Sequence, residues 1–154
     1  LLRGKSLEAL AAALRDTGTR PALGLIPSMP DAMRACEAWR GAGLDPRQGT
    51  LVVRWLLGHG LGYDEARRVY EPFDRLAAPD AAARAQIASL AAACVAAGGE
   101  TFVIINNKAE GSAPRSIPLL AESIAAASSK GAVASKDTPC ETISPSSRLP
   151  SPHS

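Results

Sequence analysis

The sequence predicts an α/β fold, and three observations support this prediction. Apolar residues recur at helical spacing in four segments, three short apolar runs lie between them, and the two kinds of segment alternate along the chain. The 154 residues suffice for one domain with its own core. Because aromatic residues make up only 4% of the chain, this core must be built from leucine, isoleucine, valine and alanine.

The helical segments carry apolar residues at positions i, i+3, i+4 and i+7. Each begins after a residue that favours helix starts, either a serine or a Pro-Asp pair. The expected helices are residues 7–14 with Ser6 as cap, 32–39 after Pro30 and Asp31, 87–95 after Pro79 and Asp80, and 117–124 with Ser116 as cap. A shorter helix is predicted at 64–70, before Pro72, and Gly98 with Gly99 ends the third helix.

Three apolar runs, at residues 22–26, 50–57 and 101–105, are predicted to be strands. Each run is short, does not alternate and is flanked by turn residues. This pattern is typical of strands that are buried on both faces of a parallel sheet. Valine, isoleucine and phenylalanine are frequent in the second and third runs, which favours strands over short buried helices.

The sequence changes character at Ser128. Residues 128–154 contain eight serines and four prolines, with no aromatic residue and little periodicity. Such a segment cannot bury enough apolar surface to offset the entropy of ordering. We therefore expect a domain over residues 1–127 and a disordered tail over residues 128–154, in which Cys140 and His153 are poor candidates for chemistry.

Charge and cysteine content favour a cytoplasmic protein with no membrane partner. The formal net charge of +2 gives no general reason to expect a nucleic acid or an acidic lipid surface. The three cysteines are odd in number and far apart, which fits a reducing cytosol. No apolar run approaches the roughly 20 residues that span a bilayer. The high alanine and arginine content suggests a GC-rich bacterial genome. The chain begins with Leu1, which leaves two explanations open: processing, or a piece of a longer protein.

Two of the predicted strands end in polar or charged side chains, and α/β proteins place binding sites at such ends. The more informative stretch is TFVIINNKAEGSAP at residues 101–114, and the other is the end of the second strand. The candidate ligand-binding residues are Arg54, Trp55, Asn106, Asn107, Lys108 and Glu110. Arg54 and Lys108 can hold an anion such as a phosphate or carboxylate. The two asparagines can hydrogen-bond a polar ligand, and Trp55 can stack on a sugar or base.

Each candidate also has a structural interpretation that the sequence leaves open. Arg54 can form a buried ion pair with Glu110 or Asp74. The asparagine side chains can bond to the local backbone to make a turn, as the Gly-Ser-Ala-Pro segment also can. Trp55 can pack in the core. Asp74 and Arg75 favour a local charge pair that fixes the connection before the next helix.

The sequence gives no support for a metal or a cofactor. His59 stands alone between Gly58 and Gly60, with no ligand residue three or four positions away. These glycines match neither the dinucleotide-binding fingerprint nor the P-loop. Glu110 lacks a second titrating group to act with it as an acid or base, so no catalytic residue can be assigned.

Three segments resemble the C-terminal part of the YecE-like family, a bacterial family of unknown function. They are LVVRW at 51–55, GLGYDEARRVYEPFDRL at 60–76 and FVIINNKAEGSAPRSIPLLAESI at 102–124. The resemblance extends over residues 22–124. It implies a TIM-barrel-type (β/α) fold, of which this chain would hold about three βα units, since a complete barrel takes about 250 residues.

Three functions remain open at this stage. The first is an enzyme or binding domain for a small anionic or sugar-like ligand. The second is a nucleic-acid-binding barrel protein with a basic rim formed by Arg54, Arg67, Arg68, Arg75 and Lys108, although the near-neutral charge and the lack of interleaved aromatic residues argue against it. The third is a non-catalytic role or a truncated fragment.

Overall fold

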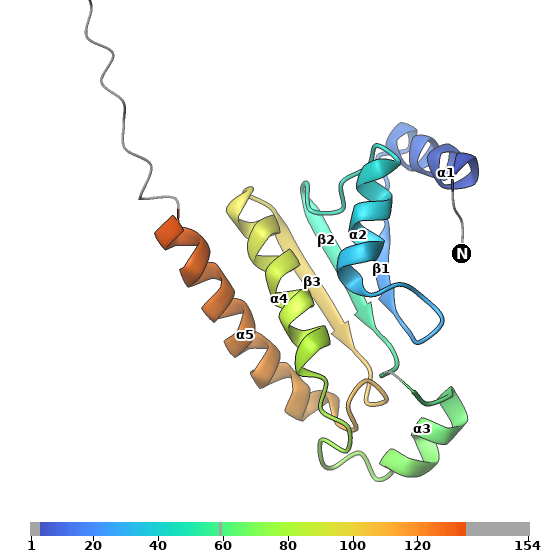
Figure 1. The fold of residues 1–154 in the computed structure, drawn as a ribbon, viewed down its shortest axis with the longest axis vertical. Coiled ribbons are helices and arrows are strands. Elements are labelled where there is room, and N and C mark those ends of the chain that lie inside the picture. The colour runs from blue at the N-terminus through green and yellow to red at the C-terminus, as the bar shows by residue number, and fades with distance from the viewer. Residues whose placement is uncertain (1–3, 59, 135–154) are drawn as a thin grey trace, which may run out of the picture.

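A computed structural model describes residues 4–58 and 60–134, and its centre is a parallel sheet (Figure 1). The sheet has three strands in the order β1-β2-β3. Leu25 pairs with Trp55, and Trp55 pairs with Ile105, so the strands end at the same level. The strands are β1 (Ala22–Leu25), β2 (Thr50–Trp55) and β3 (Glu100–Ile105). All three predicted strands are therefore confirmed, with small differences at their ends.

The helices alternate with these strands along the chain and lie beside the sheet (Figure 1). They are α1 (Lys5–Asp16), α2 (Ala32–Gly41), α3 (Tyr63–Tyr70), α4 (Ala81–Ala96) and α5 (Ala113–Ala134). α2 and α4 lie over the sheet, and α5 packs beside α4. α3 lies beyond the carboxyl ends of the strands. The α/β class and each of the expected helices are confirmed.

One face of the sheet is covered and forms the core. Leu23, Leu51 and Val53 point to this face and are at most 1% exposed. They pack against Cys36 of α2 and Ile87 of α4, together with further apolar residues of α4 and α5. The apolar residues that recur at helical spacing therefore form the side of each helix that packs against the strands.

The other face of the sheet is open, so the prediction of strands buried on both faces is wrong. Phe102 is 55% exposed and Ile104 is 49% exposed, and Arg54 lies beside Ile104 in register. No described segment packs over these side chains. Residues on this face are largely apolar, and for this reason the sequence shows no alternation although the burial alternates along β3.

The two helices expected after Pro-Asp pairs are capped by the aspartate of each pair. Asp31 accepts a hydrogen bond from Arg34 N at 3.0 Å, and Asp80 accepts one from Ala83 N at 2.8 Å. These two N–H groups would otherwise have no partner inside the helix.

The caps predicted at Ser6 and Ser116 are wrong. α1 begins one residue before Ser6, because Gly4 turns the chain with a φ of 56° and its carbonyl accepts from Leu7 N. α5 begins three residues before Ser116, because Asn107 Oδ1 accepts from Ala113 N at 2.9 Å.

The predicted tail begins too early. Residues 128–134 continue α5, so the expectation of disorder from Ser128 is wrong for these seven positions. The remainder of that prediction, with Cys140 and His153, lies outside the described residues, as does His59. No helix in the described part is both long and apolar enough to cross a bilayer.

Mutations on the two faces of the sheet should lower the free energy of unfolding by different amounts. Leu51→Ala should lower the free energy of unfolding by about 2–5 kcal/mol, because it leaves a cavity in the covered core. Phe102→Ala should lower it by less than about 1 kcal/mol, because the ring lies on the open face. Urea denaturation of both variants measures this, and equal losses would show that the open face is covered in solution.

Candidate functional site

The candidate site is built on the loop that follows β3, at residues 106–112. The loop starts at the level where β2 ends, since Asn106 N donates to Trp55 O at 2.8 Å. Asn106 Oδ1 accepts from Lys108 N at 3.0 Å, and Asn107 Oδ1 accepts from Ala113 N. Both asparagine oxygens therefore shape the backbone, as the structural interpretation of this pair expected. Their amide NH₂ groups make no hydrogen bond to the described residues.

Lys108 is a buried cation that has no counter-ion in the described part of the chain. Only 9% of the residue is exposed. Its Nζ atom lies 4.2 Å from the centroid of the Tyr63 ring and 5.6 Å from that of Phe73. No carboxylate of residues 4–58 or 60–134 forms an ion pair with it. The two rings therefore supply only part of the stabilisation that a carboxylate usually gives to a lysine ammonium.

The two aromatic residues come from the connection between β2 and α4. Tyr63 is the first residue of α3, and Phe73 follows that helix. The backbone of Phe73 has a φ of 64°, a conformation that is uncommon for residues with a large side chain. Because such a conformation costs about 1–3 kcal/mol, it persists only where the surrounding structure fixes it. Sequence reasoning did not select either ring, although the chain has only two tyrosines and two phenylalanines.

Glu110 is fully buried and holds the loop to the start of α4. Its Oε1 atom accepts from Asp80 N at 2.6 Å and forms an ion pair with Arg84 Nη1. Its Oε2 atom has no partner among the described residues. The ion pair that we considered between Arg54 and Glu110 is therefore replaced by one with Arg84.

Two glycines allow the loop to approach the neighbouring chain closely. A Cβ atom at Gly58 would collide with Ala109 O, and Gly58 N donates to Lys108 O at 3.1 Å. Gly111 has a φ of 110°, and a Cβ atom there would lie 2.6 Å from Arg75 O. The loop is thus fixed on both sides by backbone contacts that leave no room for a side chain.

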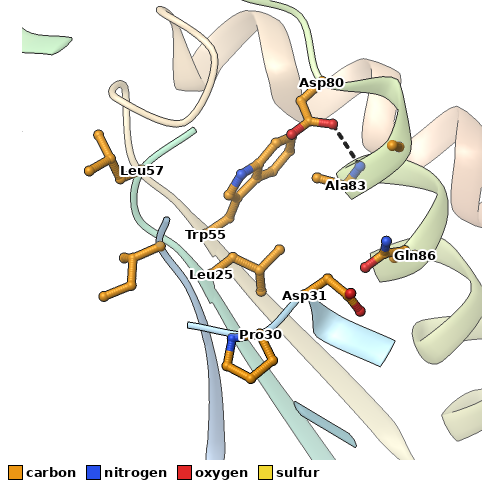
Figure 2. Close-up of a pocket in the computed structure, with 10 residues that line it drawn as sticks. Leu25, Pro30, Asp31, Trp55, Leu57, Asp80, Ala83 and Gln86 are labelled. Atoms are coloured by element: carbon orange, nitrogen blue, oxygen red, sulfur yellow. Dashed lines mark hydrogen bonds between the residues drawn. The ribbon is translucent and has the colours of Figure 1, made fainter. Parts of the chain in front are cut away.

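Arg54 and Trp55 point to opposite faces of β2. Arg54 is exposed on the open face and makes no ion pair with a described residue, so the alternative of a pair with Asp74 is not found either. Trp55 is 1% exposed and belongs to the core. Figure 2 shows its ring next to Asp80, with Leu25 below the ring and Asp31 farther down. These residues line a cavity of about 60 Å³ between the starts of α2 and α4.

The connection that precedes α4 is not fixed by the charge pair that we predicted. Asp74 and Arg75 form no ion pair with each other. Instead, Arg115 Nε of α5 donates to the backbone carbonyl of Asp74 at 2.5 Å. Ala78 N also donates to Glu110 O at 3.0 Å. Backbone groups rather than neighbouring side chains therefore hold this connection.

The described residues contain no cluster of three or more histidine, cysteine, aspartate or glutamate side chains that could hold a metal ion. Cys36 and Cys94 are free and buried. Burial raises the pKa of the Cys36 thiol, which keeps it protonated and unreactive at neutral pH. Neither cysteine lies in the loop after β3.

Comparison of the chain with protein-family models, curated proteins and solved structures finds no match. The ligand-binding residues therefore remain predictions, and the structure sorts them by position. The ammonium of Lys108 lies near the rings of Tyr63 and Phe73, and Arg54 lies on the open face. Trp55 and Glu110 are buried behind the loop.

The buried ion pair predicts a non-additive pair of mutations. Arg84→Met should destabilise the fold by about 3–5 kcal/mol, because it leaves the Glu110 carboxylate buried without its cation. Adding Glu110→Leu should restore most of this loss, because the second change removes the unpaired charge. Thermal and urea unfolding of the two single variants and the double variant measure the coupling. Additive losses would show that the two side chains act independently.

Proposed function

We propose that this chain binds a small anionic or sugar-like ligand at the carboxyl ends of its strands, with Lys108 as the central contact. The observation that carries the proposal is Lys108, a residue that is only 9% exposed and whose ammonium has no counter-ion among the described residues. Even partial burial of an unpaired charge is unfavourable. A bound anion would supply the missing partner and offset this cost.

The other candidate residues take different roles in this proposal. Asn106 and Asn107 offer NH₂ donors to the ligand while their oxygens hold the turn. Arg54 offers a second cation from the open face of β2. Glu110 fixes the position of the loop, and Trp55 supports the end of β2 from the core side. The proposal concerns binding and assigns no reaction.

We also propose that the chain is part of a YecE-like, TIM-barrel-type domain. Its strands are parallel and follow one another in sequence order, and α2 and α4 cover the same face (Figure 1). A barrel has this arrangement, whereas a doubly wound sheet reverses its strand order and carries helices on both faces. The open face with Phe102 and Ile104 would then face the barrel interior.

Lys108→Met tests the binding proposal, because it removes the charge and keeps a side chain of similar length. A hydrogen bond to a charged group contributes about 1.5–3 kcal/mol, so acetate and inorganic phosphate should bind roughly 10- to 100-fold more weakly. NMR titration of the full chain measures these affinities.

Lys130→Met is the matched control for this test, because it removes an exposed lysine of α5 that is remote in sequence from the loop. It should bind both anions as the unmodified chain does. Equal affinities of the Lys108→Met variant and the unmodified chain would contradict the proposal, provided that circular dichroism shows the variant to be folded.

A further inference from the structure

A second polar pocket lies at the amino ends of the strands, at the opposite end of the sheet from the loop after β3 (Figure 1). Its volume is about 250 Å³, and it lies between the carboxyl end of α1 and the segment of residues 42–49 that joins α2 to β2. We infer that this pocket binds a phosphate group through Arg15 and Arg20, both of which line it. The phosphate is either free or the end of a phosphate ester. No residue of this pocket takes part in the proposed function, so the two can be tested separately.

Arg15 is held over the carboxyl end of α2. Its Nη1 atom donates to Gly43 O at 2.8 Å and to Ala42 O at 3.3 Å. A Cβ atom at Gly43 would lie only 3.0 Å from this nitrogen, so the glycine leaves room for the guanidinium. These two hydrogen bonds use Nη1 alone. The Nε and Nη2 atoms make no hydrogen bond to a residue that the structure describes, and their N–H groups are available to a ligand.

Arg20 reaches the same segment from the start of β1. Its Nη1 atom lies 3.5 Å from Asp45 O, which is a long hydrogen bond, and a Cβ atom at Gly49 would lie 3.2 Å from its Nη2 atom. Within residues 4–58 and 60–134, neither Arg20 nor Arg15 forms an ion pair with a carboxylate. Both residues are exposed, so a ligand in solution can reach them. Two guanidinium groups therefore line one pocket, and each is positioned by the backbone rather than by a counter-ion.

The carboxylate that also lines the pocket is already paired. Asp45 Oδ2 lies 2.8 Å from Arg47 Nη2 and 3.3 Å from Arg40 Nε. The hydrogen bond from the Arg47 side chain holds the pKa of Asp45 below its usual value, so this carboxylate stays ionised and bound to its partners. It does not neutralise the two arginines that line the pocket.

The charges on the neighbouring segments balance, so a ligand is held by direct contacts rather than by long-range attraction. Arg40 also pairs with Glu37. Asp16 and Glu100 are exposed and do not line the pocket. The charged residues of this end of the sheet are Arg15, Arg20, Arg40 and Arg47, against Asp16, Glu37, Asp45 and Glu100.

The arrangement of donors favours a phosphate over a carboxylate. Arg15 and Arg20 come from two different elements, and the side-chain amide of Gln48, which also lines the pocket, offers an NH₂ donor. A phosphate group carries a charge of about −1.5 to −2 near neutral pH and has three or more accepting oxygens. It can therefore accept from both guanidinium groups at once. A carboxylate has one charge and two oxygens, which a single guanidinium already satisfies in a bidentate pair.

The test is an NMR titration of the full chain with inorganic phosphate, glycerol phosphate and acetate at constant ionic strength. The backbone amide signals of Gly43 and Gly49 report on this pocket, because both glycines lie against the guanidinium groups. Phosphate should shift both signals and bind about tenfold more tightly than acetate. Tighter binding of glycerol phosphate than of inorganic phosphate would identify an ester as the ligand, and the reverse order would identify free phosphate.

Arg20→Met should weaken phosphate binding at Gly43 and Gly49 by about five- to tenfold, because it removes one of the two guanidinium groups. Arg68→Met is the matched control, because it removes an exposed arginine of α3 at the other end of the sheet (Figure 1). It should leave the affinity measured at the two glycines unchanged.

Three results would overturn the inference: no shift of Gly43 and Gly49, equal affinities for phosphate and acetate, or a folded Arg20→Met variant that binds phosphate as the unmodified chain does. Should Arg20→Met fail to fold, the ranking of phosphate over acetate at the two glycines of the unmodified chain decides. Lys108→Met separates the two sites, because the glycine signals should still respond to phosphate in that variant. Loss of this response would show that the signals report on Lys108, and the inference would then be wrong.

Discussion

The position of the loop after β3 depends on one buried carboxylate. Glu110 joins this loop to α4 through Asp80 N and Arg84, and both of those groups belong to the start of that helix. α4 in turn covers the centre of the sheet, so the pair connects the core to the strand ends. A buried pair of this kind adds little net stability, but it fixes geometry because either charge alone is strongly unfavourable. The close backbone contacts at Gly58 and Gly111 also fix the position of the loop.

The loop after β3 carries the Lys108 ammonium, which has no carboxylate partner among the described residues. Lys108 is held by its backbone to Asn106 and Gly58, while its ammonium lies near two aromatic rings and forms no ion pair with a described residue. A backbone that is already fixed before a ligand arrives lowers the entropic cost of binding. The left-handed backbone at Phe73 is part of the same arrangement. The strained backbone of Phe73 therefore lies close to Lys108, the largely buried lysine that lacks a counter-ion among the described residues.

The sequence predicted the fold well where local signals decide the structure. Helical spacing and the preceding Pro-Asp pairs placed α2 and α4, because both signals act within one turn. It failed at Ser6 and Ser116, where Gly4 and Asn107 provide the helix start instead. The open face was missed because its residues are apolar, and their exposure depends on which segments pack above them. Lys108 could be selected from its strand end, but Tyr63 and Phe73 reach it only through the folded connection.

The central claim is that the Lys108 ammonium lies near the rings of Tyr63 and Phe73 and is open to an added anion. The most direct measurement is the NMR spectrum of the lysine side chains of the full chain, recorded with and without acetate. The account predicts that ring currents set the Lys108 side-chain protons apart from those of Lys5 and Lys130, and that acetate shifts the Lys108 signals selectively. Lys108 signals that coincide with those of the other lysines and respond no differently to acetate would contradict it.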